Sequence, residues 1–593
     1  MISPPQDNPA PGLIIADDDA RLGDAEGAYF ALLGPDDVRR WGKTHRWLPA
    51  LPPEDRDATL DDYLSCMSQL DGHNYAKPAY WRTALGIRDV EKSILFNGLD
   101  QLWRLRALLD KRRAGDGDIA LLVSDPEFAT LAGELALRSG WRVSIQLKPL
   151  WQRWFSRLRA RWQGLRYVLS LAAPMGARRP PVPASADLII ATVSTLDRVQ
   201  SSEAPRDFIF GQLPDQLAAK GKNVAMFAQL VGETRLADGG SGADSPFPIR
   251  TFGDLTGPLD AIWSFARALI SPIRAPAIAS ALGIDVKRLI GADVERARWQ
   301  DLPANMLLER ALGKLTKRSP NAVLLHSFEN NAWESVCQDL ARSFRLRSVG
   351  LQHNALIRSH LKLYRNAKRP APDAIIVSGP IYQRLLQDEF GYDATRLVCG
   401  FAVRQFDIHS KRAKSSPTGE PQQVLVMLQE ALTSPIFLEL VRKAFKGAKG
   451  LTVTLRSHPA VPIADILESS RLRLRPPFRK SRSESLYDDL DFHDIAICGG
   501  TTAELEAVAF GVPCVFVDTG ETVSSNPLFA EPALNAVARD AVELRAACEK
   551  LAALPAREFG EQHRAARAFV EGAFRAPTSK AFNQILKTLT PHA

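Results

Sequence analysis

The chain has 593 residues, of which 45% are hydrophobic and 24% are charged, a balance typical of soluble globular proteins. This length exceeds what a single hydrophobic core can organise, so we expect two or three domains. No apolar run approaches the roughly 20 residues that a membrane-spanning helix needs, which excludes the usual pattern of an integral membrane protein.

The charge and the cysteines narrow the classes of partner. A formal net charge of +8 predicts a preference for anionic partners. No RNA-binding motif, zinc finger or long basic tail accompanies it, so nucleic acid is not an expected partner. The six cysteines form no C-x-x-C pair, which predicts reduced thiols and no metal site. The N-terminus lacks the basic and apolar regions of an export signal, so we expect a cytoplasmic protein.

The N-terminal part of the chain is predicted to be mostly helical. Residues 1–25 are rich in Pro, Asp and Gly, which indicates a flexible lead-in. Residues 26–115 follow a helical hydrophobic spacing and are expected to form a helical extension. A strand over 118–124 and a helix over 128–138 then open the first α/β array.

Residues 150–185 are expected to be an amphipathic insert in that array. Trp151, Trp154, Phe155 and Trp162 recur at helical spacing, and arginines lie between them. A helix of this kind suits the interface of a membrane that carries anionic lipid. An ordinary helix that packs its aromatic residues on a neighbouring domain would show the same pattern, so both interpretations stay open.

Strands and helices alternate through the rest of the chain. The predicted strands are 187–194, 223–229, 321–326, 346–351, 373–378, 396–400, 424–428, 451–455, 494–498 and 514–517. Such alternation implies parallel sheets that are covered by helices on both faces. We therefore expect an α/β fold with two facing Rossmann-like domains, residues 116–372 and 373–593, after the helical extension.

Two loops at strand ends in the second domain carry groups that bind phosphate. Arg456, His458 and Pro459 follow one predicted strand and offer a cation and an imidazole. Pro459 removes a backbone donor and holds the turn, which leaves the His458 ring available at the end of the strand. The acids that could contact the ribose hydroxyls of a nucleotide are Glu484 and Glu504.

The second of these loops comprises Gly499, Gly500, Thr501 and Thr502, before a predicted helix. Free backbone N–H groups and the helix dipole favour a phosphate at such a place. The threonines can cap the helix at the same time, because both roles use the same helix end. Because ligands bind at the carboxyl ends of parallel strands, both loops are expected to hold one phosphate group.

Two candidates for proton transfer follow predicted strands in the first domain. Glu329 lies at a strand-helix junction and could take a proton from an acceptor hydroxyl, or could only complement the helix dipole. His353 could serve as a base, donate to a departing phosphate, or only satisfy backbone groups of its loop. Glu334 lies within the predicted helix, where a structural role is favoured.

These motifs resemble those of GT-B glycosyltransferases. Glu329-Asn330-x-x-Trp333-Glu334, followed by Gly350-Leu351-Gln352-His353, resembles a bacterial family of surface carbohydrate biosynthesis proteins. The His458-Pro459 and Thr501-Thr502 pairs resemble the H-P and paired Ser/Thr motifs of bacterial CMP-sialic acid and CMP-Kdo transferases. In those families the histidine and the hydroxyls hold the CMP phosphate, and an acid between the motifs holds the ribose. By position that acid is Glu484.

The resemblance implies an inverting, metal-independent transferase without a resident cofactor. It would move a Kdo-like or nonulosonic sugar from a CMP-linked donor to a cell-surface glycan or glycolipid, on the inner face of the cytoplasmic membrane. The acidic motif of the sialyltransferases, an acid pair followed by glycine, is not evident here. The alternatives are a CDP-glycerol glycerophosphotransferase, a nucleotide-sugar epimerase, and a non-catalytic assembly protein with a degenerate nucleotide cleft.

Overall fold

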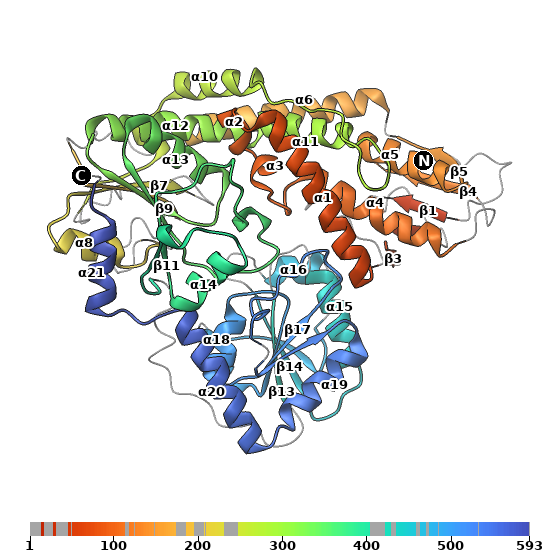
Figure 1. Ribbon diagram of the computed structural model, residues 1–593. Helices are drawn as coiled ribbons and strands as arrows, with labels where there is room; N and C mark the ends of the chain where they lie inside the picture. The colour runs from red at the N-terminus through yellow and green to blue at the C-terminus, as the bar shows by residue number, and fades with distance from the viewer. Residues whose placement is uncertain are drawn as a thin grey trace.

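In the computed structural model, the described residues form three parallel sheets with helices around them (Figure 1). The structure describes residues 13–16, 28–30, 46–48, 50–112, 118–123, 125–147, 149–173, 185–194, 207, 209–230, 247–403, 422–428, 434–457, 463–469, 474–483, 485–531 and 533–591. Within these residues, no helix combines the length and the apolar character that crossing a bilayer requires. The expected α/β class with parallel sheets is confirmed.

The first sheet has the strand order β3-β2-β1-β4-β5. Its strands are β1 (Leu13–Ala16), β2 (Ala28–Phe30), β3 (Arg46–Trp47), β4 (Asp118–Leu122) and β5 (Arg142–Ile145). The helices in this part of the chain are α1 (Pro53–Asn74), α2 (Pro78–Trp81), α3 (Ala84–Ile87), α4 (Ile94–Asp110) and α5 (Pro126–Arg138). Asp125 begins α5 by accepting hydrogen bonds from the N–H groups of Glu127 and Phe128 at 2.9 and 2.8 Å.

The second sheet has the order β12-β11-β10-β9-β6-β7-β8. Its strands are β6 (Leu188–Ser194), β7 (Val224–Leu230), β8 (Ile249–Arg250), β9 (Val323–Ser327), β10 (Arg347–Leu351), β11 (Ala374–Val377) and β12 (Leu397–Cys399). The helices in this part of the chain are α6 (Leu150–Leu171), α8 (Leu213–Ala219), α9 (Phe252–Leu255), α10 (Pro258–Leu269), α11 (Lys287–Trp299), α12 (Asp301–Arg318), α13 (Ala332–Phe344) and α14 (Pro380–Asp388).

The third sheet has the order β15-β14-β13-β16-β17-β18. Its strands are β13 (Gln423–Met427), β14 (Thr452–Arg456), β15 (Phe478–Lys480), β16 (Ile495–Cys498), β17 (Cys514–Val517) and β18 (Asn535–Ala538). Its helices are α15 (Ser434–Ala444), α16 (Ile463–Ser469), α17 (Leu486–Phe492), α18 (Ala503–Phe510), α19 (Ala541–Ala552) and α20 (Ala556–Ala573). All four residues of β16 are fully buried, as expected for a central parallel strand with helices on both faces.

All three sheets follow one topology. Numbered within its own sheet, the third has the order 3-2-1-4-5-6 of doubly wound dinucleotide-binding folds. The second sheet has the same order with one further strand after the sixth, and the first sheet has it without the sixth. Each sheet therefore has a switch point between its first and fourth strands, where ligands bind in such folds.

The strand pairing corrects three expected boundaries. The expected lead-in contains β1, and the expected helical extension contains β2 and β3. Strand β4 pairs with β1 rather than with the second sheet, so the N-terminal region is an α/β module with its own sheet. Strands β11 and β12, expected in the last domain, extend the second sheet from β10. The last helix, α21 (Ser579–Thr588), packs on β12 as well.

Candidate functional site

The carboxyl ends of the second and third sheets meet in the middle of the molecule. The loop after β10 donates the backbone N–H of Ser359 to the carbonyl of Ser524, which lies in the loop after β17, at 3.0 Å. One residue earlier, the Arg358 guanidinium lies 4.7 Å from the ring centre of Phe529. Because ligands of open α/β sheets bind at these ends, this contact locates the candidate site.

Glu329 is at the centre of the polar groups on the second-sheet side. Its Oε1 lies 3.5 Å from Nε2 of His353 and accepts a hydrogen bond from the Asn354 amide. Its Oε2 accepts a hydrogen bond from Nδ2 of Asn331 at 2.8 Å, and Nζ of Lys362 donates to Oδ1 of Asn331 at 2.9 Å. The carboxylate is thus held from three directions at the end of β9.

Charge and exposure separate the roles of Glu329 and His353. Burial raises the pKa of Glu329, but the facing His353 and Lys362 outweigh that effect and bring the pKa down to about 2. The Glu329 side chain is 23% exposed, whereas the His353 side chain is only 2% exposed. A substrate could therefore reach the ionised carboxylate of Glu329, and His353 lies behind it.

Glu334 holds the turn before α13 from inside. Its Oε1 accepts a hydrogen bond from the Ser327 hydroxyl at 2.6 Å, and its two oxygens lie 3.2 and 3.1 Å from the N–H of Glu329. Burial, and then the charge of Glu329, raise the pKa of Glu334 to about 8. This fully buried group fixes the position of Glu329 and has no surface for a substrate.

Glu504 occupies the equivalent place in the third sheet, after β16. Its Oε1 accepts hydrogen bonds from the N–H groups of Gly500 and Thr501, at 2.7 and 2.9 Å. Its side chain is fully buried, and burial raises its pKa to about 8. The expected ribose contact of Glu504 is therefore wrong. The expectation of free N–H groups at Gly500 and Thr501 is also wrong, because this carboxyl already engages both.

The two threonines of this loop are partly exposed to solvent. Thr501 and Thr502 are half-buried, as is Gly499. The Thr501 hydroxyl accepts a long hydrogen bond from the N–H of Ala503, at 3.4 Å, and keeps its own proton for a ligand. These hydroxyls are the groups of the loop that a phosphate could contact.

The loop 518–529 after β17 covers the glycine turn. The Ser525 hydroxyl donates to the carbonyl of Gly499 at 3.2 Å. Gly500 has a φ of +110°, and a Cβ atom added there would lie 2.5 Å from the Ser525 oxygen. Only glycine fits this backbone and this close approach.

The same loop is fastened to the N-terminal module. Arg56 of α1 pairs with Asp518 at 2.9 Å, and Arg104 of α4 donates to the carbonyl of Gly520 at 2.7 Å. Thr522 donates to Asp100, and Val523 belongs to the hydrophobic core of the N-terminal module. Figure 1 shows α1 reaching down to the third sheet, so the module contributes directly to the shape of the site.

Arg456 serves a structural purpose at the end of β14. Its Nη1 donates to the carbonyls of Ser483 and Ser485 at 3.0 and 3.3 Å and lies 2.5 Å from Oδ2 of Asp489. The guanidinium holds the turn before α17, and the expected phosphate contact does not fit this arrangement. His458, Pro459 and Glu484 lie outside the described residues.

Several residues of the site carry no signal in the sequence. Asn331, Asn354 and Lys362 surround Glu329, but only Asn331 lies near the start of an α-helix, and residues 354–372, after the motif that ends at His353, follow no motif. Arg104 lies on a helix more than 400 residues away from Gly520, whose carbonyl it binds. Periodicity predicts elements and their ends, and it does not predict such distant partners.

A cavity of about 570 Å³ lies between α6 and the start of α13. Its lining includes Gln163 and Tyr167 of α6, Asp301 at the start of α12, and Asn331 and Trp333 before and in α13. Asn331 lines this cavity and also donates to the Glu329 carboxylate, so one residue links the two. Amide, carboxylate and aromatic groups together suit a polar ligand that carries hydroxyls.

The aromatic residues of α6 lie on the surface. Trp151, Trp154, Phe155 and Trp162 are between 57% and 61% exposed. The buried residues of this helix are Gly164, Val168 and Leu171, in its second half. Packing of the aromatic stripe on a neighbouring domain is therefore wrong for the part of the chain that the structure describes.

No protein-family model and no curated protein matches this chain. The solved calicheamicin glycosyltransferase CalG4 is similar at 14% identity and a TM-score of 0.39, over 69% of this chain and 99% of that chain. The kitacinnamycin glycosyltransferase is similar at 16% identity and a TM-score of 0.40, over 69% and 100%. A putative UDP-N-acetylglucosamine 2-epimerase from Listeria monocytogenes has 10% identity and a TM-score of 0.36, over 68% and 95%.

Proposed function

We propose that this protein is a glycosyltransferase that moves a sugar from a nucleotide-linked donor to a glycan acceptor. The observation that carries the proposal is the contact between Ser359 and Ser524 at 3.0 Å, because it joins the ligand-binding ends of two Rossmann-like sheets. One side offers the Glu329 carboxylate and the other offers the threonine loop over Gly499–Thr502. A transfer reaction needs a group that accepts the proton close to a group that binds the departing phosphate.

The third sheet would bind the donor. Its strand order is that of dinucleotide-binding folds, and the loop after β16 lies at its switch point. We assign the donor phosphate to the hydroxyls of Thr501 and Thr502, together with His458 on the basis of the sequence motif. The resemblance of the His458-Pro459 and Thr501-Thr502 pairs to the motifs of CMP-sugar transferases supports a CMP-linked donor with a Kdo-like or nonulosonic sugar. By its position between these pairs, Glu484 would contact the ribose of that donor.

The second sheet would bind the acceptor and carry out the proton transfer. In the proposed step the acceptor oxygen bonds to the anomeric carbon while the bond from that carbon to the phosphate oxygen breaks. Glu329 takes the hydroxyl proton, and the nucleotide leaves with the electron pair, so the configuration inverts. Lys362 adds a positive charge next to the reacting groups without the need for a metal ion. His353 positions the carboxylate.

The acceptor would be a growing surface glycan on the inner face of the cytoplasmic membrane. The exposed aromatic residues of α6, with five arginines and no acidic residue in that helix, support contact with anionic lipid. The protein would then be peripheral on that membrane.

A donor screen tests the proposal. The purified full-length chain is incubated with CMP-, CDP- and UDP-linked donors and with a glycolipid fraction, and nucleotide release is followed by mass spectrometry. Release of CMP that depends on the acceptor is the expected result. Transfer of glycerol phosphate from CDP-glycerol would replace the proposal with a glycerophosphotransferase, and conversion of a UDP-sugar without an acceptor would replace it with an epimerase. No binding of CMP or CDP by calorimetry would favour the non-catalytic protein.

A further inference from the structure

Exposed apolar side chains are concentrated on two helices of this protein. Among the described residues, eleven of the eighteen exposed large hydrophobic side chains lie on α6, on α10 or at the residue that ends α10. On α10, Leu259 is 82% exposed, Ile262 is 50% exposed and Trp263 is 43% exposed. Large apolar patches are rare on the surface of soluble monomers and mark places where a partner binds.

The two helices form one surface. They contact each other, and Figure 1 shows them along the same edge of the molecule, opposite the third sheet. We call this the α6/α10 surface and define it by Trp151, Trp154, Phe155 and Trp162 of α6 and by Leu259, Ile262 and Trp263 of α10. The pattern of predicted strands and helices did not indicate that α10 would add exposed apolar side chains to this surface.

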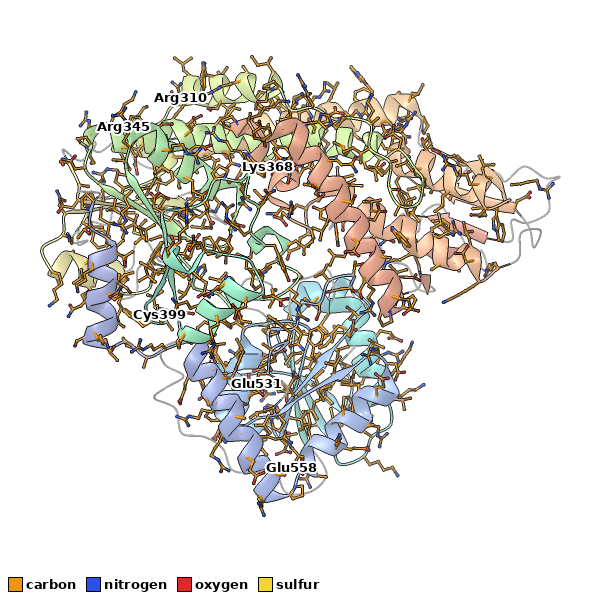
Figure 2. All side chains as sticks on the ribbon, in the orientation of Figure 1. Arg310, Arg345, Lys368, Cys399, Glu531 and Glu558 are labelled. Carbon is orange, nitrogen blue, oxygen red and sulfur yellow. The ribbon has the colours of Figure 1, made fainter. Side chains whose placement is uncertain are left out.

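Cations flank the apolar residues of this surface. Helix α6 has five arginines and no acidic residue, and Arg157, Arg159 and Arg166 are exposed. Arg310 of the neighbouring helix α12, labelled in Figure 2, lies with its guanidinium 4.4 Å from the ring centre of Trp263 of α10 and pairs with Asp260 of α10 at 2.6 Å. Tryptophan and arginine side by side suit the boundary between lipid tails and anionic headgroups.

The cavity described above lies directly beneath α6. Ala160, Gln163, Gly164 and Tyr167 of that helix line it, and so does Asn331, which binds Glu329. A head group that enters under α6 would therefore come next to Glu329 while its lipid chain stays outside.

We propose that the α6/α10 surface docks this protein on an anionic bilayer, and that the cavity beneath α6 takes the carbohydrate head group of a lipid-linked acceptor from that bilayer. The second part rests on the proposed function, since it names the acceptor of the same site. The first part stands without it, because docking on lipid needs no turnover. Positive charge and exposed tryptophans on one face favour an anionic bilayer over a second copy of this basic chain, which would bring like charges together.

Vesicle sedimentation tests the docking. The full chain is mixed with vesicles of phosphatidylcholine, alone or with phosphatidylglycerol. We expect binding only to the anionic vesicles, reduced at least about tenfold by Trp151→Ser with Trp154→Ser and, separately, by Leu259→Ser with Ile262→Ser. The matched control is Leu137→Ser on α5, which is 62% exposed on another helix and should bind as the wild type does. Circular dichroism verifies that each variant folds.

Three results would overturn the docking. They are unchanged vesicle binding by the α10 variant, equal binding to neutral and anionic vesicles, and a dimer in light scattering that the same substitutions dissociate. A Gln163→Trp variant tests the cavity separately: it should bind vesicles normally and lose transfer to a lipid-linked acceptor while it still binds the donor nucleotide. Normal transfer by that variant would overturn the cavity assignment, whereas absence of nucleotide binding in the wild type would contradict the proposed function alone.

Discussion

Oε1 of Glu329 lies 3.5 Å from Nε2 of His353, and the two residues follow the neighbouring strands β9 and β10. The more exposed carboxylate faces the site, and the imidazole lies behind it with 2% of its side chain exposed. A pair of this kind separates the group that meets a substrate from the group that orients it.

Replacing Glu329 by Gln should lower kcat about a hundredfold or more, because the amide cannot accept the hydroxyl proton. Replacing His353 by Ala should have a smaller effect on kcat and should move the acidic limb of the pH–rate profile upward. The reason is that loss of the facing imidazole lets the pKa of Glu329 rise from about 2. Steady-state assays across pH measure both effects. Glu558→Gln on α20, an exposed glutamate, is the control and should leave the profile unchanged.

Gly500→Ala should destabilise the fold more than Gly447→Ala does. Both glycines have a positive φ, +110° and +75°, but an added Cβ meets Ser525 at position 500 and no atom within 4 Å at position 447. We expect a loss of about 1 kcal/mol for Gly447→Ala from the backbone alone. For Gly500→Ala, crowding adds about 1–3 kcal/mol. Urea unfolding measures both, and equal losses would contradict the close packing of Ser525 on the turn.

Arg104→Ala should loosen the loop over residues 518–529. The guanidinium donates to the Gly520 carbonyl at 2.7 Å with 13% of the side chain exposed, so its removal should cost about 1.5–3 kcal/mol. Hydrogen exchange in that loop should become faster. Arg106→Ala on the same helix removes only an exposed pair with Asp110 at 2.8 Å and should cost less than about 1 kcal/mol. Unchanged exchange in the Arg104 variant would show that the N-terminal module does not hold the loop.

Glu504→Gln should change how stability depends on pH. Burial raises the pKa of Glu504 to about 8 in the folded protein, against about 4.3 in an unfolded chain. Between these values the folded state binds one proton more than the unfolded state, so this residue makes the wild type less stable as pH rises towards 8. The glutamine keeps an acceptor for Gly500 and Thr501 but has no proton to lose. Thermal melts from pH 5 to 9 should therefore show a smaller decline for the variant. The exposed Glu549→Gln variant should follow the wild type, and parallel curves for Glu504→Gln would refute the prediction.

Local pattern was enough to predict the central strands of the second and third sheets, but not β8, β15 and β18, which lie at the edges of these sheets. The apolar runs that became β6, β7, β9, β10, β13, β14, β16 and β17 are continuous because central parallel strands are buried on both faces. The loops at their carboxyl ends were correctly predicted, and with them the positions of Glu329 and the Gly499–Thr502 turn. The arginine and tryptophan spacing of α6 also predicted an exposed aromatic helix as one of two alternatives.

The strands β1, β2 and β3 could not be found in this way. They have only four, three and two residues, too few to show a period, and β1 is joined to β4 across about a hundred residues of sequence. Short strands depend on the neighbour that supplies their hydrogen bonds, and that neighbour is chosen by packing in three dimensions. For this reason the sequence pattern of the N-terminal α/β module predicted only helices.

The sequence by itself determined where strands end, which polar groups stand there, and which helix carries tryptophan with arginine. Only the tertiary structure decided which groups bind the side chains of Glu504 and Arg456, which both form hydrogen bonds within their own loops. It also decided that His353 lies behind Glu329, and that α10 contacts α6 to form one surface. The physical reason is the distance along the sequence over which each effect acts. Periodicity and capping act over a few residues, whereas burial, pKa and the choice of hydrogen-bond partner depend on groups that the chain brings together from hundreds of residues apart.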